Sequence, residues 1–257
     1  PEREAQVLRA IQERNPGPLA SEHIASVLRE LMSSCLALEQ PLSVAFLGPE
    51  GTYSQAAALK HFGQSALPQG QASIHKVFRQ VEERLCDYGV VPVENSTEGM
   101  VGQTLDCFLE SPLQITGEIE LPVVHHLLAG RGAEQSDIQL ILGHEQALGQ
   151  CRQWLDGHLP NVPREAVASN GEAARRAGVE AGVAAIAGEL AAGLHQLDTL
   201  ASAIQDSSTT TPRFVVLAQE SVPPSGHDKT SLLVSARNRP GALLGLLRPF
   251  EENGVSL

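Results

Sequence analysis

The stretch that decides the fold is GVVPVENSTEGMVGQT, residues 89–104. Its apolar start is typical of the end of a buried strand, which we expect to end at Pro92. A run of polar residues, 94–98, follows, and two glycines then let the backbone turn where other residues would be strained. A helical pattern resumes at Leu105–Leu109. A strand that leads through amide and hydroxyl groups into a helix is a common geometry for binding small anions, although an ordinary polar turn has the same pattern.

Composition and charge narrow the possible functions. With 257 residues the chain can bury a sizeable core and form more than one folding unit. The net charge of −12 argues against nucleic acid and anionic membrane as partners, but local donors could still bind a small anionic substrate. No apolar run reaches the ~18 residues of a membrane span, and we see no export leader. We therefore expect no membrane partner and a cytoplasmic location.

The four cysteines give no sign of a metal site or a disulfide framework. They lie far apart in the sequence and lack paired metal-ligand spacing. A chain of this size does not need covalent cross-links, so we expect reduced thiols. The first residue is not Met and the last four residues, GVSL, continue an apolar pattern, so we expect a fragment of a longer protein.

Residues 1–40 have the pattern of two helices. Apolar residues of the first helix fall on one face, and the run 15–18, Asn-Pro-Gly-Pro, ends it. We expect Ser21 to cap the second helix, whose apolar residues also recur at helical spacing. Two such helices are too little for a domain, so they need a partner surface.

From residue 42 onward, strand and helix patterns alternate with short connections, which is typical of a parallel α/β sheet. Thr52 and Ser54 are candidate caps of one helix, and Gln146, Cys151 and Trp154 are expected on a single helix. The expected strands are 43–48, 88–93, 113–120, 138–143, 166–169, 183–187 and 213–218. The other expected helices are 55–61, 73–84, 104–109, 170–177 and 188–194.

The C-terminal part has the composition of a linker followed by a new domain. Residues 221–228, SVPPSGHD, form the linker. A strand at 229–238, a turn at Pro240-Gly241 and a helix at 242–254 are expected beyond it. This segment is too short to form a domain alone.

Residues 43–219 resemble the prephenate dehydratase family over nearly their whole length. The motifs in order are GPEGTYS, PVENSTEG with TLD, HHLL, GHEQALGQC, SNGEAA, AAIAGELAAGL and a final RF at 213–214. The segment before them resembles the end of a chorismate mutase helical domain, and NRPGALLGLL after them resembles the opening of an ACT regulatory domain. The whole chain thus resembles a fragment of the bifunctional chorismate mutase–prephenate dehydratase family.

The resemblance to the mutase is partial. Arg3 and Glu4 match functional positions of that family, whereas Cys35 and Glu39 stand where it often has Ser and Gln. The long first helix, which carries most of the cationic ligands, is missing. We therefore expect no chorismate mutase activity.

The resemblance implies an α/β fold with a two-lobed dehydratase domain similar to periplasmic binding proteins. A partial helical mutase segment precedes this domain, and a truncated α+β ACT domain follows it. The expected domains are 1–41 for the mutase segment, 42–220 for the dehydratase, 221–228 for the linker and 229–257 for the ACT segment. Lobe one would be 42–118 plus 206–220, and lobe two would be 119–205.

The family reaction converts prephenate to phenylpyruvate with loss of CO2 and water, and it requires no metal or redox cofactor. The protein must orient a dianion, protonate the departing hydroxyl and exclude water, and uncharged donors suit this task. By resemblance, Asn95 and Gln146 orient the substrate, Arg213 holds a carboxylate and Phe214 packs on the ring. The implied catalytic residues are Asn95, Ser96, Gln146, Thr211, Arg213 and Phe214. The implied substrate-binding residues are Thr52, Tyr53, Ser54, Thr97, Gly99, His125, Ser169 and Asn170.

Some residues have an alternative, structural explanation. Asn95 and Ser96 could simply close the turn, and one of His125 and His126 is expected to be a core histidine rather than a metal ligand. Glu94 is expected to be an acceptor in the loop rather than a proton donor. Glu145 stands where the family usually has Pro, and its charge is unfavourable near a dianion.

Pro212 is the main departure from the family pattern. The family has Thr-Arg-Phe here, and its threonine hydroxyl is thought to assist the leaving group, whereas proline has neither hydroxyl nor N–H. Thr211 would point to the opposite face of an extended strand, so it replaces the hydroxyl only if the register shifts. We expect a properly built site with impaired turnover.

Two other functions remain open from the sequence: an arogenate or cyclohexadienyl dehydratase, and a non-catalytic binding module of the same fold. The family usually forms homodimers or larger homo-oligomers. Its intact members respond to phenylalanine through the ACT domain, where Gly241, Ala242 and Leu243 match the regulatory turn.

Overall fold

The structure is a computed structural model, and it divides the chain into two units, residues 1–222 and 223–257, which are described separately. The residues that it describes are 6–8, 10–11, 14–95, 99–207, 211–223, 226, 228–232, 234–256, with the side chain of Asn95 left out.

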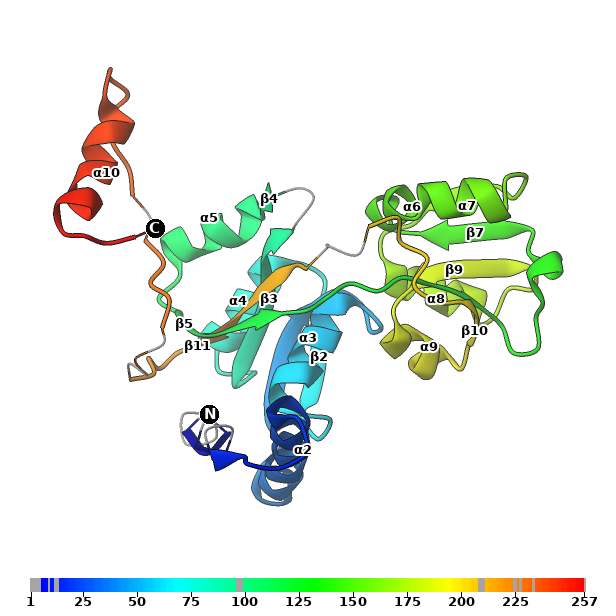
Figure 1. Ribbon diagram of the computed structural model, residues 1–257, viewed down its shortest axis with the longest axis horizontal. Coiled ribbons are helices and arrows are strands. Elements are labelled where there is room, and N and C mark those ends of the chain that lie inside the picture. The colour runs from blue at the N-terminus through cyan, green and yellow to red at the C-terminus, as the bar shows by residue number, and fades with distance from the viewer. Residues whose placement is uncertain are drawn as a thin grey trace. The chain divides into compact units, whose positions relative to one another are not determined.

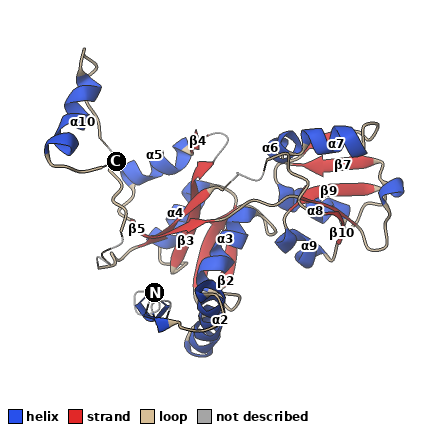
Figure 2. Cartoon of the chain, in the orientation of Figure 1, coloured by secondary structure: helices blue, strands red, loops and turns tan. Residues whose placement is uncertain are grey.

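The first sheet of unit 1 is mixed. Its strand order is β2-β1-β3-β11-β5, and β4 pairs with β3 at one end (Figures 1 and 2). The strands are β1 (Ser43–Leu47), β2 (Leu67–Gln71), β3 (Tyr88–Asn95), β4 (Gly99–Met100), β5 (Gln114–Glu120) and β11 (Arg213–Ala218). β1 is parallel to β2 and β3, whereas β11 runs antiparallel to both β3 and β5. The expectation of a purely parallel sheet was wrong, because the chain returns from the second sheet and inserts β11 between two earlier strands.

Helices α3 (Tyr53–Phe62), α4 (Ile74–Glu82) and α5 (Gly102–Glu110) accompany this sheet. The apolar face of α4 packs with β3 and β11 in one core cluster, and α3 packs on the opposite side of the strands in a second cluster. Ser73 caps α4 by accepting a hydrogen bond from the backbone N–H of Lys76. The strand β2 was not expected, because Pro68 and Gly70 suppress its strand pattern.

Strand β3 continues three residues beyond Pro92, so the predicted end was wrong. Pro92 pairs with Phe214, and the register shifts between Phe214 and Arg213, which pairs with Glu94. Such a bulge accommodates a residue that has no N–H to donate. The carbonyl of Pro92 accepts a hydrogen bond of 2.6 Å from the Thr104 hydroxyl, which ties the strand to α5.

The second sheet has the order β10-β6-β9-β7-β8. Its strands are β6 (His126–Ala129), β7 (Leu140–Gly143), β8 (Arg164–Ala166), β9 (Val183–Ala187) and β10 (Asp198–Ala201). β7 is parallel to β8 and β9, and β6 is antiparallel to β9 and β10. β10 was not expected, because its sequence DTLA has no extended apolar alternation. The mixed α/β class with two open sheets is confirmed.

Five helical segments accompany this sheet. They are η1 (Gln135–Asp137), α6 (Glu145–Gln150), α7 (Arg152–His158), α8 (Asn170–Ala177) and α9 (Glu189–His195). The single helix expected from Gln146 to Trp154 is two helices, which meet at the buried Cys151. The strand expected at 166–169 starts two residues earlier and ends three residues earlier, because Ser169 caps α8 instead of continuing the strand.

Helix α2 (Ser21–Glu39) precedes the first sheet. Ser21 is its first residue rather than its cap, and the Ser21 hydroxyl accepts a hydrogen bond from Asn15 Nδ2. Among the described residues, no helix is both long and apolar enough to cross a membrane.

Unit 2 contains one helix, α10 (Ala242–Glu252), among its described residues. It begins after Gly241, which has a left-handed φ of 80°. The strand expected at 229–238 is wrong for the residues that are described there, 229–232 and 234–238, since none of them is in a ladder.

Candidate active site

One cavity of about 460 Å³, here called the cleft cavity, collects residues from both sheets of unit 1. Its lining comes from β3, β4, the start of β11, the residues before β6 and after β7, and helices α3, α5, α6 and α8. Its lining residues are Tyr53, Ser54, Pro92, Glu94, Gly99, Met100, Val101, Gly102, Gln103, Val123, His125, His144, Gln146, Ala147, Gln150, Asn170, Pro212 and Phe214.

No Lys or Arg is among the described residues that line the cleft cavity. Its polar groups are hydroxyls, amides, imidazoles and the carboxylate of Glu94. Among the described residues, an anion in this cavity would therefore be bound by uncharged donors and by the N-terminal ends of helices.

Gln146 supplies a donor without a partner. Its Nε2 is buried and makes no hydrogen bond to any described group. Leaving a buried donor unpaired costs about 1–3 kcal/mol. An oxygen atom of a ligand in the cavity would recover this cost, so Gln146 is suited to contact a substrate.

The turn from β7 into α6 is fixed by two hydrogen bonds. The backbone N–H of His144 donates to Asn170 Oδ1 at 2.8 Å, and Nδ1 of His144 accepts from the backbone N–H of Gln146 at 3.3 Å. His144 is thus the cap of α6. The Ser169 hydroxyl accepts from the backbone N–H of Glu172 and caps α8, which places Asn170 at the cavity.

A chain of hydrogen bonds joins α3 to α6 through His125, which is only 2% exposed. Nε2 of His125 lies 2.8 Å from Gln150 Oε1, and Nδ1 lies 3.0 Å from the Tyr53 hydroxyl, which also donates to the carbonyl of Val124. Burial lowers the pKa of His125, although the hydrogen bond to Gln150 acts in the opposite direction. Burial also raises the pKa of Tyr53. His125 thus links α3 to α6 and fixes the wall of the cavity.

Arg213 is held by two carboxylates. Its Nη1 lies 2.6 Å from Glu94 Oε2, and its Nε lies 2.5 Å from Glu118 Oε1. Glu118 and then Glu94 raise the pKa of Arg213. Arg213 does not line the cavity, while its neighbours Pro212 and Phe214 do. Its predicted role as a substrate ligand requires the guanidinium to exchange one of these partners.

The other predicted site residues are distributed as follows. Tyr53, Ser54, Gly99, His125, Gln146, Asn170 and Phe214 come together at the cleft cavity. Ser169 and Thr211 do not line it. Thr52 occupies the N-cap position of α3, but neither it nor Ser54 makes a capping bond, because the Thr52 hydroxyl donates back to Pro49 O. Ser96, Thr97 and the side chain of Asn95 lie outside the described part of the chain.

The two sheets also meet at a close backbone contact. A Cβ on Gly171, at the start of α8, would lie 2.3 Å from the carbonyl oxygen of Glu50, in the turn before α3. A Cβ on Gly188 would lie 3.1 Å from the Tyr53 ring. Only glycine allows the approach at Gly171, whereas a Cβ at Gly188 would require a small shift of the Tyr53 ring. Gly171 therefore fixes how closely the two parts of the cavity pack.

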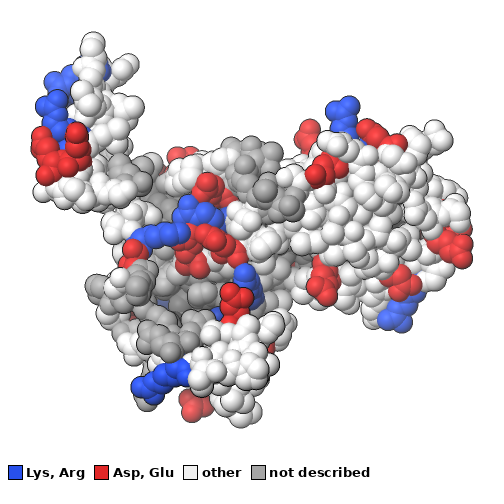
Figure 3. Space-filling model, in the orientation of Figure 1, with Lys and Arg blue, Asp and Glu red and all other residues white. Residues whose placement is uncertain are grey.

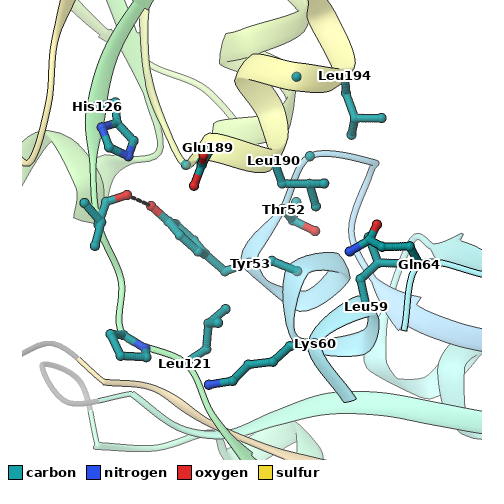
Figure 4. Close-up of a pocket in the computed structure, with 16 residues that line it drawn as sticks. Thr52, Tyr53, Leu59, Lys60, Gln64, Leu121, His126, Glu189, Leu190 and Leu194 are labelled. Carbon is teal, nitrogen blue, oxygen red and sulfur yellow. Dashed lines mark hydrogen bonds between the residues drawn. The ribbon is translucent and has the colours of Figure 1, made fainter. Parts of the chain in front are cut away.

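A second cavity of about 680 Å³ lies on the other side of Tyr53. Figure 4 shows Lys60 on one side of the Tyr53 ring and His126 with Glu189 on the other. Leucine side chains form much of its wall, and Lys60 Nζ donates to the carbonyl of Glu120 at 2.8 Å. Of the predicted site residues, Thr52 and Tyr53 line it, and so do Gly51, His126 and several residues of the motif AAIAGELAAGL.

Neither the charged residues on the described surface nor the metal-binding side chains indicate a further site. The face in Figure 3 shows Lys and Arg interspersed with Asp and Glu rather than gathered in a continuous basic area. Among the described residues, no group of three or more His, Cys, Asp or Glu is arranged to hold a metal ion.

The sequence analysis missed His144, Gln150 and Gln103 as cavity residues. For His144 a signal was present, since a histidine between a buried strand and a helix falls at the carboxyl end of the strand, where sites of α/β proteins lie. For the two glutamines no signal existed, because a helix has many exposed glutamines and only packing selects those that face a cavity.

Two mixed sheets that contribute uncharged donors to one cavity define an α/β protein of the cleft type, which binds a small polar molecule. The prephenate dehydratase family model matches residues 44–222. A bifunctional chorismate mutase/prephenate dehydratase from Stutzerimonas stutzeri is 56% identical over 257 residues, which cover all of this chain and 70% of that protein. A prephenate dehydratase from Mycobacterium marinum is 34% identical over 226 residues, covering 83% of this chain and 72% of the relative.

A solved structure of the same family is also similar to this chain. A prephenate dehydratase from Arthrobacter aurescens, crystallised with L-Phe, has a TM-score of 0.74 and 31% identity, and covers 83% of this chain and 73% of its own. The chain belongs to the prephenate dehydratase family.

Proposed function

We propose that this chain converts prephenate to phenylpyruvate. The observation that carries the proposal is that motifs of the family, far apart in the sequence, line one cavity in which Gln146 Nε2 lacks a partner. A dianion with a ring hydroxyl fits a cavity that offers uncharged donors on several sides.

The reaction needs few chemical groups. The bond between the ring and its carboxylate breaks and releases CO2, the electron pair enters the ring, and the hydroxyl on the opposite ring carbon leaves as water with one proton. Aromatisation supplies the driving force, so orientation and one proton donor are sufficient. No metal or redox cofactor takes part in this scheme.

The positions of Gln146 and Phe214 in the cavity suit two roles: Gln146 donates to a substrate oxygen, and Phe214 packs against the ring. The resemblance to the family implies further donors from Asn95, Ser96 and Thr97. Arg213 holds a carboxylate by giving up its bond to Glu94 or Glu118. The walls of the cavity come from both sheets, and their approach excludes water from the ring.

Pro212 lines the cavity at the position of the family threonine, so we propose that turnover is impaired. A spectrophotometric assay of phenylpyruvate formation with prephenate, comparing the parent with Pro212→Thr, tests this. We expect the variant to turn over at least about tenfold faster, since a positioned proton donor contributes 10²–10⁴-fold at most sites. Equal rates would show that the missing hydroxyl is immaterial.

The same assay with arogenate separates the related dehydratases. Product from neither substrate, with binding retained in calorimetry, would contradict the proposed reaction and favour a binding module. We further propose a cytoplasmic homodimer or larger homo-oligomer, and phenylalanine as the effector of the intact protein through the turn at 241–243.

A further inference from the structure

The N-terminal end of α5 lies at the cleft cavity without a capping side chain. Val101 occupies its N-cap position and has no side-chain acceptor for a hydrogen bond. Helices α4, α6 and α8 differ, because a side chain caps each of them: Ser73, His144 and Ser169. An uncapped helix start leaves backbone N–H groups available to an anion.

Two N–H groups at this helix start have no acceptor among the described residues. The N–H groups of Thr104 and Leu105 donate to the carbonyl of Val101. Those of Gly102 and Gln103, which line the cleft cavity, donate to no described group. The first turn of α5, all of which is described, carries no acidic side chain that would repel an anion.

The neighbouring strand holds this helix start in place. The N–H of Val101 donates to the carbonyl of Val93 at 2.9 Å, and the Thr104 hydroxyl donates to the carbonyl of Pro92 at 2.6 Å. Both acceptors belong to β3. The two unpaired N–H groups are therefore oriented before a ligand arrives, which lowers the entropic cost of binding.

Unpaired side-chain donors in the same cavity indicate a ligand with acceptor oxygens. Ser54, in the first turn of α3, is only 8% exposed, and its hydroxyl makes no hydrogen bond to a described residue. Nε2 of Gln146 on α6 is also buried without a partner. The one carboxylate of the described lining, that of Glu94, is paired with Arg213. Helices α3, α5 and α6 thus all present donors that an anionic ligand would satisfy.

Resting on the proposed dehydratase function, we propose that the N-terminal end of α5 binds a carboxylate of the substrate through the N–H groups of Gly102 and Gln103. The bound group is the carboxylate of the 2-oxo acid side chain, which remains in the product. Its charge does not change during the reaction. A site on the other carboxylate would lose its interaction as CO2 forms, so a site fixed in the fold suits the carboxylate that stays.

The test removes one N–H by replacing Gly102 with proline, which is tolerated at the first position of a helix. Gly102 has no left-handed φ, a Cβ there would meet nothing within 4 Å, and Val101 before it is extended, so Gly102→Pro fits the fold. Gly102→Ala keeps the N–H and is the reference for the added side chain.

Calorimetry with phenylpyruvate and steady-state kinetics with prephenate compare the two variants. Relative to Gly102→Ala, we expect Gly102→Pro to bind phenylpyruvate about tenfold more weakly and to raise KM for prephenate about tenfold. The reason is that a hydrogen bond to a charged group is lost. We expect kcat to stay within about threefold, because the bond is lost equally from the bound substrate and the transition state.

Glu189→Pro is the matched control. Glu189 is the first residue of α9 and lines the second cavity, so the same change removes an N–H from a helix start outside the proposed site. Its KM for prephenate and its affinity for phenylpyruvate are expected to match those of the parent.

Gln103→Glu tests the site without removing a backbone group. A carboxylate in the first turn stabilises a helix but repels an anionic ligand, so the fold is retained while phenylpyruvate binds at least about fivefold more weakly. A thermal unfolding midpoint equal to that of the parent or higher, together with weaker binding, supports the inference even if Gly102→Pro does not fold.

Several outcomes would overturn the inference. Equal phenylpyruvate binding by Gly102→Pro and Gly102→Ala would do so, as would binding by Gln103→Glu that matches the parent. A higher KM for prephenate in Gly102→Pro without weaker phenylpyruvate binding would mean that the departing carboxylate is held there, against the proposal. A parent that does not bind phenylpyruvate would also overturn it.

The same measurements separate this inference from the proposed function. A parent that forms phenylpyruvate, with Gly102→Pro equal to Gly102→Ala, would reject the inference alone. A parent that binds phenylpyruvate but forms none from prephenate, with weaker binding in Gly102→Pro, would reject the proposed function and support the carboxylate site.

Discussion

The two cavities that share Tyr53 are lined by different kinds of side chain. The cleft cavity has amides, hydroxyls and imidazoles, and its described lining has no Lys or Arg. The second cavity is larger, about 680 Å³ against 460 Å³, and it has leucines with Lys60 and Glu189. Size would select the second cavity, whose wall also has a buried atom without a partner, Nδ1 of His126. Most of the predicted site residues, however, lie at the first cavity.

This difference teaches that the kinds of polar group on the wall of a cavity, and not its size, indicate a site. Apolar walls next to a solvated lysine are stable without a ligand, because the lysine keeps its water. A buried amide donor without an acceptor is not. The following predictions test whether the two cavities differ in function as they differ in chemistry.

The largest effect is expected from Gln146→Ala. Removing the donor should lower kcat/KM for prephenate about 100-fold, which corresponds to ~2.7 kcal/mol, because a bond to substrate is lost in a cavity without competing water. Steady-state kinetics measures it. The control is Gln64→Ala in the second cavity, which should be within twofold of the parent. Equal losses in both variants would remove the distinction between the cavities.

Substitutions of the neighbouring residues His125 and His126 should have different effects on the free energy of unfolding. His125→Gln removes a buried ring with two partners and should lower the free energy of unfolding by about 2 kcal/mol, whereas His126→Gln, in the second cavity, should cost much less. Denaturant unfolding measures both.

The pH dependence of stability gives a further check on His125. Since the folded pKa of His125 is lowered, the unfolded state binds its proton first, and stability is lost as the pH falls below about 6.5. His125→Gln should make this acid-side loss smaller. A steeper loss in the variant would mean that His125 is charged in the folded protein.

The close contact between the sheets should affect the cleft cavity. Gly171→Ala puts a Cβ 2.3 Å from Glu50 O, so the two parts must separate, and kcat/KM should fall about tenfold. Gly193→Ala is the control, since its Cβ would meet nothing within 4 Å and it lines the second cavity. A normal rate for Gly171→Ala would show that the spacing of the sheets does not limit catalysis.

The smallest effect is expected from a change of one charge. Glu118→Gln leaves Arg213 with one carboxylate, so KM for the dianionic substrate should fall about threefold and depend more on salt. Glu189→Gln removes the same charge from the second cavity and should leave KM unchanged. A lower kcat with a higher KM in Glu118→Gln would mean that Glu118 positions the Arg213 side chain.

Much of the fold followed from local patterns. The ranges of α8, β9 and β11 agree with those expected, because each has a clear apolar period and a cap or turn residue at its ends. The errors fall where a distant partner decides the conformation. Pro92 stays in β3 because β11 forms a bulge against it, and β2 forms despite Pro68 because β1 pairs with it.

The sequence by itself determined the family, the alternation of strands and helices, and the kinds of donor available for an anion, because these depend on residue type and spacing. Only the tertiary structure decided that Arg213 pairs with two carboxylates, that Gln146 has a donor to spare, and that His144 shares a cavity with Pro212. Those relations join residues from different strands and helices. No local pattern contains them, since they exist only after the two sheets pack.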